Sequence, residues 1–367
     1  MALVTILFFV LFSFVLILSY FLFFKKSSNL LIAAILFIIV FLILVGFTSY
    51  NSLIVLENTK DYATIGPYGD YIGGVLNPLI SVFAVFAAGF AFYAQYDANR
   101  QVQDQFKIQQ FESQFYEMLR LHKDNVNSLY LTIKKKIIYP KDEEIVESSV
   151  NGKVVFEHMK FELSLIYMIA LKNFYTDNPK IRLNEAYAIF FNGVSERYRG
   201  KHIFFDELLE LEGYTDNLDH ENFNKKLKER LSFNRDITQM LEFPLFKGHA
   251  HQLAHYYRHL FQTVKFIANQ DESFISYEKK RNYLRILRSQ LSNTEQTLLF
   301  YNWHSDFGKQ WESEKNKFFT DYRMIHNLYN ELLISEFKLE NIFDLHSSGY
   351  RKEKGRLNDN LFEFQDW

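Results

Sequence analysis

Three histidines at helical spacing are the first candidates for chemistry, because histidine is a common metal ligand. His251, His255 and His259 follow one another at intervals of four residues, so a helix would place all three on one face. Two histidines four residues apart can hold zinc, yet no HExxH motif, cysteine or obvious carboxylate ligand accompanies them. We therefore interpret them as surface or hydrogen-bonded rings, and we predict no metal and no cofactor.

A second stretch, residues 283–295, combines helical spacing with many polar side chains. Arg285 and Arg288 would be neighbours on one helix face. Ser292 and Glu295 follow one turn later and fit a capping box, in which serine and glutamate each satisfy a free backbone N–H. The sequence thus leaves two interpretations open. One is a helix break that Ser292 caps, and the other is a polar groove.

The groove hypothesis draws on both stretches. Arginine, histidine and amide side chains could bind an anionic ligand or a partner peptide there. The candidate members share polar or aromatic character: His255, Tyr257, Arg258, Arg285, Arg288, Gln290, Ser292, Asn293, Glu295 and Asn302. We assign no catalytic role to any of them.

Arg197 and His202 form a third pattern, five positions apart. Helical prokaryotic ribonucleases of the HEPN type carry such a pair, which there would stabilise phosphate charge and transfer protons. Here Tyr198 follows the arginine, where that family prefers a small polar residue, and Gly200 interrupts the spacing. The sequence has no P-loop, dinucleotide fingerprint, G-x-S-x-G or kinase signature. We predict that the protein is not an enzyme. A membrane-tethered ribonuclease that uses Arg197 and His202, or Arg258 and His259, remains the alternative.

These patterns lie in the more polar of two parts of the chain. Residues 1–96 hold six charged side chains, whereas the remaining 271 residues hold 78. This contrast excludes a wholly soluble, a disordered or a collagenous protein. The chain has no cysteine, which excludes disulfides, zinc fingers, iron–sulfur clusters and thiol nucleophiles. The net charge of −2 argues against direct DNA binding, which normally needs a basic surplus.

The N-terminal part predicts transmembrane helices at residues 2–24, 30–50 and 72–95, because each is charge-free and about 20 residues span a bilayer. The third is rich in small residues that let helices approach closely, including Gly73, Gly74, Ala84 and Ala88. Asn77-Pro78 lies near its start, where the missing N–H of proline costs little if the helix begins there. A two-span arrangement remains open.

Orientation follows from Lys25 and Lys26, which place the loop between the first two spans on the cytoplasmic side. Three spans then give an external N-terminus and a cytoplasmic C-terminal domain. A two-span arrangement would also leave that domain inside, but it would put the lysine pair outside.

The polar part predicts an all-α domain. Apolar spacing and the absence of proline or glycine indicate a stalk helix over 97–140, followed by a cytoplasmic helical domain over 141–345 and a loosely structured tail over 346–367. Val150-Asn-Gly-Lys-Val154 is typical of a small β-hairpin, although a loop is an equal alternative. Helical patterns cover residues 156–174, 183–191, 204–211, 222–231, 249–268, 278–303 and 314–337.

Several motifs occur in order over residues 71–330. The strongest are LAHYYRHLF at 253–261 and YLRILRSQLSNTE at 283–295, followed by FYN at 300–302; GGVLNP at 73–78, FESQFYEML at 111–119 and GKVVFE at 152–157 accompany them. Together they resemble the putative phage abortive infection family, the AbiC-like membrane proteins. Tyr257, before the arginine, is a mild departure from the family's usual aromatic residue.

The resemblance implies a multi-pass protein of the bacterial inner membrane with an antiviral role and no established catalytic residues. Related proteins serve as toxic effectors beside retrons, where infection triggers membrane damage. We therefore expect an abortive-infection effector that perturbs the membrane when its cytoplasmic domain is triggered. Expected partners are the lipid bilayer, further copies of the chain, and a reverse transcriptase–RNA complex or a phage-triggered protein. A passive anchor for a neighbouring nucleic-acid enzyme is a further alternative.

Overall fold

The computed structural model describes residues 39, 43, 46, 50, 62–139, 142–174, 176–231, 243–345 and 359–363. The chain divides into two compact units, Met1–Gln110 and Phe111–Trp367, each of which is considered by itself. The expected spans at 2–24 and 30–50 lie outside the described residues, apart from the four isolated helical positions.

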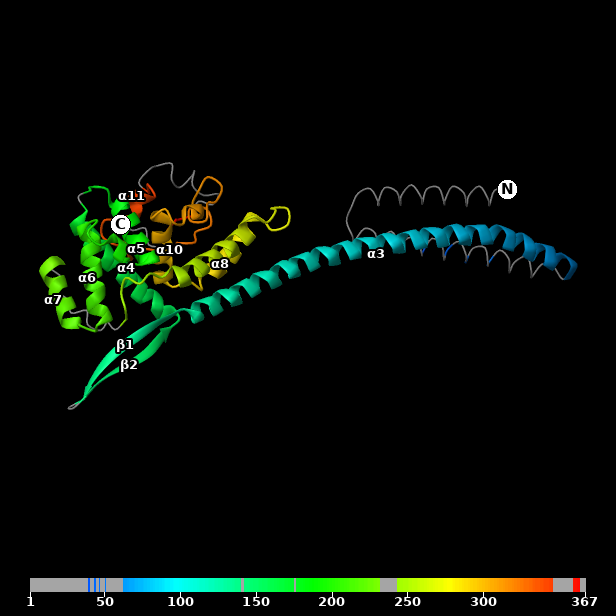
Figure 1. The fold of residues 1–367 in the computed structure, drawn as a ribbon. Coiled ribbons are helices and arrows are strands. Elements are labelled where there is room, and N and C mark those ends of the chain that lie inside the picture. Colours follow the sequence, from blue (N-terminus) through cyan, green and yellow to red (C-terminus); the bar gives the residue numbers. More distant parts are fainter. Residues whose placement is uncertain are drawn as a thin grey trace. The chain divides into compact units, whose positions relative to one another are not determined.

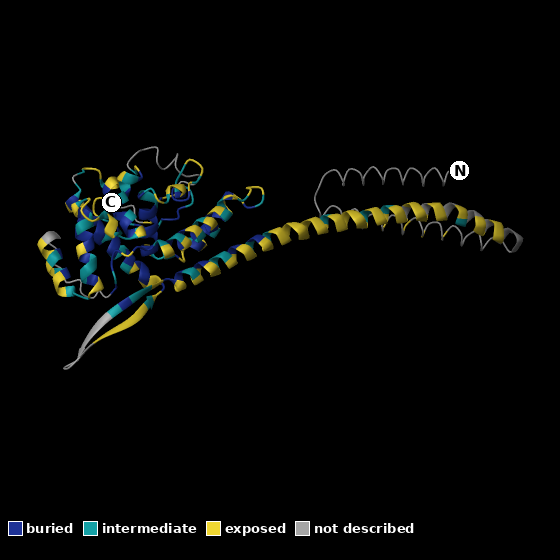
Figure 2. Cartoon of the chain, in the orientation of Figure 1, coloured by how far each residue is buried: buried dark blue, intermediate teal, exposed yellow. Residues whose placement is uncertain are grey.

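Helix α3, Tyr62–Ser128, contains the third expected span (Figure 1). It begins at Tyr62, before the expected span, and both Pro67 and Pro78 lie inside it, so the helix does not begin at Asn77-Pro78. Among the described residues, one stretch, Ile80–Ser128 of this helix, is long and apolar enough to cross a membrane, and none of its apolar window is buried (Figure 2).

The stalk helix expected over 97–140 ends at Ser128, and the following residues form a strand instead. Strand β1, Tyr130–Tyr139, pairs antiparallel with β2, Asp142–Asn151, so a hairpin is present but its strands meet near Pro140 rather than Asn151-Gly152. Gly152, with φ of 75°, precedes α4 instead. The cross-strand ion pair of Lys134 and Glu147 (3.3 Å) favours this pairing, which helical spacing alone cannot reveal.

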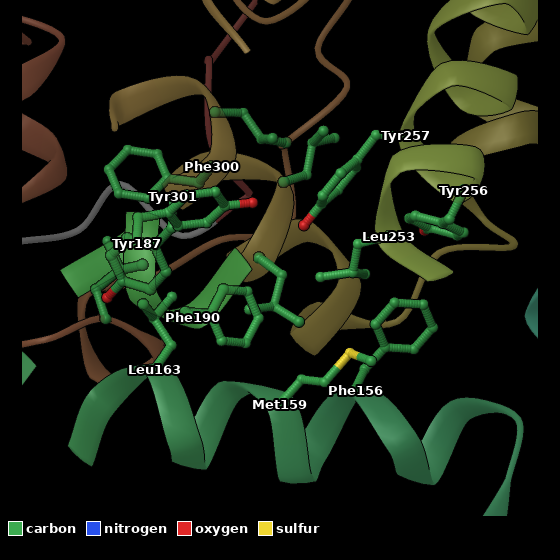
Figure 3. Packing of buried hydrophobic residues seen from close by; sticks show 14 of the residues in the cluster. Phe156, Met159, Leu163, Tyr187, Phe190, Leu253, Tyr256, Tyr257, Phe300 and Tyr301 are labelled. Atoms are coloured by element: carbon green, nitrogen blue, oxygen red, sulfur yellow. The ribbon is translucent and has the colours of Figure 1, made fainter. Parts of the chain in front are cut away.

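The second unit is mostly helical, as predicted. Its helices are α4 (Lys153–Asn173), α5 (Pro179–Asn192), α6 (Ile203–Asp216), α7 (His220–Leu231), α8 (Ala250–Ala268), α9 (Tyr277–Arg288), α10 (Asn293–His304) and α11 (Leu339–Ile342). Helix α4 contacts α5, α6, α7 and α10 and buries a broad face, while its opposite side is intermediate or exposed. Aromatic residues of α4, α5, α8 and α10 meet there (Figure 3).

Two glycines let the segment that follows α5 pass close to the segment that precedes α8. Gly193 and Gly248 have φ of 85° and 83°, which side chains rarely adopt. A Cβ atom on Gly248 would lie 2.4 Å from the backbone nitrogen of Gly193. The Val194 N–H donates to the Phe246 carbonyl beside them (2.9 Å). This close approach fixes where α8 begins.

The helix expected over 314–337 is absent, and only a 3₁₀ turn, Asn330–Leu332, occurs there. Two features oppose a helix. The Glu312 carboxylate accepts the backbone N–H groups of Phe319 and Thr320 (2.9 and 3.0 Å), and Arg323 has a φ of 61°. The apolar spacing reflects burial in irregular structure, since Phe318, Phe319, Met324, Ile325 and Leu328 are all buried.

The expected loose tail is wrong for residues 359–363. Leu361 and Phe362 are fully buried, and the Glu363 N–H donates to the His326 carbonyl (2.8 Å). Residues 346–358 and 364–367 lie outside the described residues.

Candidate functional site

The expected helical stretch 278–303 breaks between α9 and α10, and Ser292 caps the second helix. Its Oγ accepts from the Glu295 N–H (3.2 Å), while Glu295 Oε2 accepts from the Ser292 N–H (2.7 Å). Glu295 is 1% exposed, and its Oε1 accepts from the Tyr256 hydroxyl of α8 (2.9 Å). The capping interpretation is therefore confirmed for these two residues.

Tyr257 and Asn302 are also structural. The Asn302 amide donates to the Tyr187 hydroxyl (3.0 Å), and its backbone carbonyl accepts from Gly308 (2.8 Å). Figure 3 shows Tyr257 and Tyr187 turned into the core from α8 and α5. Burial raises the pKa of Tyr257 well above its usual value, and the neighbouring Tyr187 hydroxyl raises this pKa further. Both tyrosines therefore stay neutral, which suits packing rather than proton transfer.

The remaining predicted residues do not gather in that core. His255, Arg258, Arg285, Gln290 and Asn293 are all exposed. Gln290 contributes its backbone carbonyl, which accepts from the Lys153 ammonium (2.9 Å). The ten predicted residues thus separate into capping and core positions, of which Ser292 is half-buried and the others buried, exposed positions, and Arg288.

Arg288 belongs to a set of arginines that sequence spacing only partly revealed. We call Arg281, Arg288 and Arg323 the arginine cluster. Arg288 Nη1 donates to the Arg323 carbonyl (2.9 Å). Arg281 Nη2 and Arg323 Nη2 contact the two carboxylate oxygens of Asp359, at 2.6 and 3.0 Å. Two guanidinium groups, 8% and 4% exposed in their side chains, therefore hold one carboxylate between them.

The three guanidinium groups of the arginine cluster have Asp359, Asp321 and Glu363 as nearby carboxylates. Burial, then the charges of Arg285 and Arg281, lower the pKa of Arg288 to about 10. Burial alone would raise the pKa of Asp359, but the hydrogen bond from Arg281 and the charge of Arg323 lower it overall. Within the described residues, Nη1 of Arg323 is buried without a hydrogen-bond partner. A further anionic group would thus find donors here.

The chain's own residues 359–363 occupy this cluster, and we call them the tail segment. Arg323 also donates to the backbone carbonyls of Asp359 (3.0 Å) and Asn360 (3.2 Å). The Leu361 carbonyl lies 2.8 Å from His326 Nδ1. The arrangement is that of a short peptide bound by arginines through its backbone and one carboxylate. The groove hypothesis included Arg288, and the structure places a peptide from the same chain beside it, which the sequence did not indicate.

Residues 248–333 match the family model described as putative phage abortive infection protein. The resemblance expected from the motifs is confirmed over this segment. No curated protein matches the chain. No solved structure matches it either.

The matched abortive-infection segment contains α8, α9, α10 and the whole arginine cluster. It begins beside a buried pair that sequence reasoning missed. Glu162 of α4 is fully buried; its Oε2 lies 2.9 Å from His249 Nε2, and its Oε1 accepts from the Phe246 N–H (2.8 Å). A charged residue inside an apolar helical pattern was the available signal, because such a carboxylate needs buried partners.

The histidines of the matched segment do not form a metal site, and no group of metal ligands occurs among the described residues. His255 and His251 are exposed, whereas the ring of His259 stacks 6.3 Å from that of His122 in α3. His122 is 2% exposed, and in the described chain neither ring nitrogen has a hydrogen-bond partner. Burial, then the charges of His259 and Lys153, lower its pKa to about 4.

The first arginine–histidine pair of the ribonuclease alternative, Arg197 and His202, lies outside the matched segment. The Arg197 guanidinium lies over the Tyr198 ring (5.0 Å), within a 3₁₀ turn, Glu196–Tyr198. His202 caps α6: its Nδ1 accepts from the Phe204 N–H (3.1 Å), and its ring stacks on Phe174 (4.7 Å). Both residues have local structural roles.

Proposed function

We propose that this chain is an anti-phage abortive-infection effector that acts at the bacterial inner membrane without enzymatic chemistry. The match over residues 248–333 supports the antiviral role. The membrane role is supported by the three charge-free runs and by the exposed apolar stretch of α3. The observation that carries the proposal is the presence, in one chain, of the abortive-infection segment and a helix able to enter a bilayer.

The arginine cluster is where we place the trigger. Its occupant is a short segment whose carboxylate and backbone carbonyls contact the arginines and whose Leu361 and Phe362 are buried in the core. An anionic ligand or peptide could compete for the arginine donors, and it would have to offset the burial of these two side chains. Such a competitor favours release of the tail segment only if it binds the protein with the tail segment released more tightly than the protein with the tail segment bound. Release of the tail segment would then be the first step of activation.

The spans are the proposed executing part. Gly73, Ala84 and Ala88 fall on one side of α3 at helical spacing, and a Cβ atom added to Gly73 would meet nothing within 4 Å. Small residues on one face allow close helix–helix association in lipid. Association between copies would then disturb the membrane of the infected cell.

The test compares Ala88→Leu with Val85→Leu in infected cells. Both keep α3 apolar, but only the first fills the small-residue face. We expect Ala88→Leu to reach the membrane yet to lose phage protection, dye entry and depolarisation together, while Val85→Leu keeps all three. Protection by Ala88→Leu with intact membrane potential would contradict the proposal, and accompanying RNA cleavage would favour the ribonuclease alternative.

A further inference from the structure

The hairpin of β1 and β2 is a two-stranded sheet with both edges uncovered. Within the described chain each strand pairs with the other alone, over ten residue pairs. Its base is fixed to α8, because the Gln252 side chain accepts from the Tyr130 N–H (3.1 Å) and donates to the Tyr130 carbonyl (2.8 Å). Farther out, residues 144–149 are all exposed. A lone pair of strands is marginally stable in water, so a further strand would be a stabilising partner.

The contact with Gln252 also reveals which backbone groups point outward. In an antiparallel pair, residues alternate between those that bond the partner strand and those that face away. Tyr130 faces away, so the backbone groups of Thr132 and Lys134 do as well. Their partners in register, Ser149 and Glu147, face outward from β2. Each edge therefore presents donors and acceptors in a row that another strand could pair with.

The two edges carry opposite charges. Strand β1 contains three consecutive lysines, residues 134–136, and no acidic residue. Strand β2 contains Asp142, Glu143, Glu144 and Glu147, and no basic residue. Like charges directly across a pair of strands are destabilising, so two β1 edges or two β2 edges repel each other. Only a β1 edge against a β2 edge of another copy brings opposite charges together.

The acidic strand also exposes apolar surface. Ile145 and Val146 are 59% and 37% exposed, and successive strand residues point to opposite faces. A neighbouring strand would cover part of both side chains. The edge thus combines the backbone pairing and apolar contact that stabilise a sheet with charges that select the partner edge.

We propose that the hairpin is a self-association surface in which the β1 edge of one copy pairs with the β2 edge of the next. The occupant is a second copy of this chain because each edge is complementary to the other edge of the same hairpin. The contact joins two different surfaces, so each added copy still offers an edge. Such head-to-tail contacts close into a ring or continue as a row.

The first test uses cross-linking of the full-length protein in detergent, which the absence of native cysteine makes clean. Thr132→Cys places a thiol on β1, and Ser149→Cys places one on β2. With a short bismaleimide, we expect a dimer when the two variants are mixed and none from either variant alone. The exposed Lys265→Cys, mixed with Ser149→Cys, is the control and should not cross-link. No dimer in the first mixture, or an equal yield from one variant alone, would overturn the proposal.

The second test separates pairing between copies from pairing within one hairpin. Replacing residues 134–136 by glutamate makes both edges acidic, and replacing Glu143, Glu144 and Glu147 by lysine makes both edges basic. Each variant alone should form smaller assemblies than the original protein by light scattering, whereas their equimolar mixture should recover the original size. Mixing leaves the like charges within each hairpin unchanged, so recovery can come only from contacts between chains. A mixture that stays as small as the single variants, or single variants that assemble like the original protein, would refute the head-to-tail contact.

Discussion

Asp359 bridges Arg281 and Arg323, with its two carboxylate oxygens 2.6 and 3.0 Å from their Nη2 atoms. The asparagine variant Asp359→Asn would keep the shape but remove the negative charge between two nearly buried cations. We expect it to cost about 1–2 kcal/mol, since Asp359 is itself partly exposed to water. Thermal unfolding and protease sensitivity of the tail segment measure this. Glu363→Gln, which can still accept from Asn327, is the control and should change neither.

The same bridge predicts an acid-sensitive contact. The folded-state pKa of Asp359 is below its usual 3.8. A carboxylate of lowered pKa stabilises the fold above its unfolded pKa and loses that effect as the pH falls through the folded value. Protease sensitivity near residue 359 should therefore rise below pH 4 in the original protein. In Asp359→Asn it should already be high at neutral pH, and a parallel pH response in both proteins would contradict the bridge.

His122 predicts a second pH dependence, at higher pH. Its folded-state pKa is about 4 against 6.5 for an ordinary histidine, so its contribution to stability is present above pH 6.5 and is lost as the pH falls toward 4. The full loss is on the order of 3 kcal/mol. His122→Phe should be at least as stable at pH 7 and should flatten this part of the stability profile, as denaturant unfolding at several pH values would measure. The exposed His255→Gln serves as the control and should leave the profile unchanged.

The close approach of Gly193, at the end of α5, to Gly248, just before α8, predicts a strong glycine requirement. Gly248→Ala would place a methyl group 2.4 Å from a backbone atom at a φ of 83°, so we expect a loss of more than about 3 kcal/mol and poor accumulation in cells. Gly213→Ala, inside α6 with nothing within 4 Å of the new Cβ, should be neutral or stabilising by about 0.5–1 kcal/mol. Similar accumulation of both variants would show that this close approach can relax.

Arg288 tests the proposed trigger. Arg288→Ala removes a donor to the Arg323 carbonyl and lowers the positive charge of the cluster. We expect loss of phage protection with normal accumulation in the membrane, whereas the exposed Arg285→Ala should still protect. If Arg288→Ala instead fails to accumulate, its role is packing alone.

Local signals predicted much of the helical unit. The capping box at Ser292 and the apolar spacing of α4 to α8 act within a few turns, so they are readable without tertiary contacts. The stalk was predicted too long because residues 130–139 have no helix breaker. Their strand form depends on pairing with β2, which is a long-range contact.

The candidate site was less predictable for the same reason. Sequence spacing singled out Arg288 because it is close to Arg285, yet its structural neighbours are Arg323 and the tail segment. Residues 314–337 show helical spacing, but the Glu312 carboxylate captures the backbone N–H groups of Phe319 and Thr320 that a helix would use. Contacts that a helical spacing pattern does not show decided each of these outcomes.

Residues 248–333, the segment that matches the abortive-infection family, are not expected to fold independently of the rest of the chain. Its buried polar groups depend on residues on both sides of it: His249 on Glu162, Asn302 on Tyr187, and two arginines on Asp359. Excised or grafted alone, residues 248–333 would leave these groups without partners at a cost of about 1–3 kcal/mol each. A distant relative that keeps this segment must therefore supply its own equivalents of the three partners, even where the rest of its sequence has diverged beyond alignment.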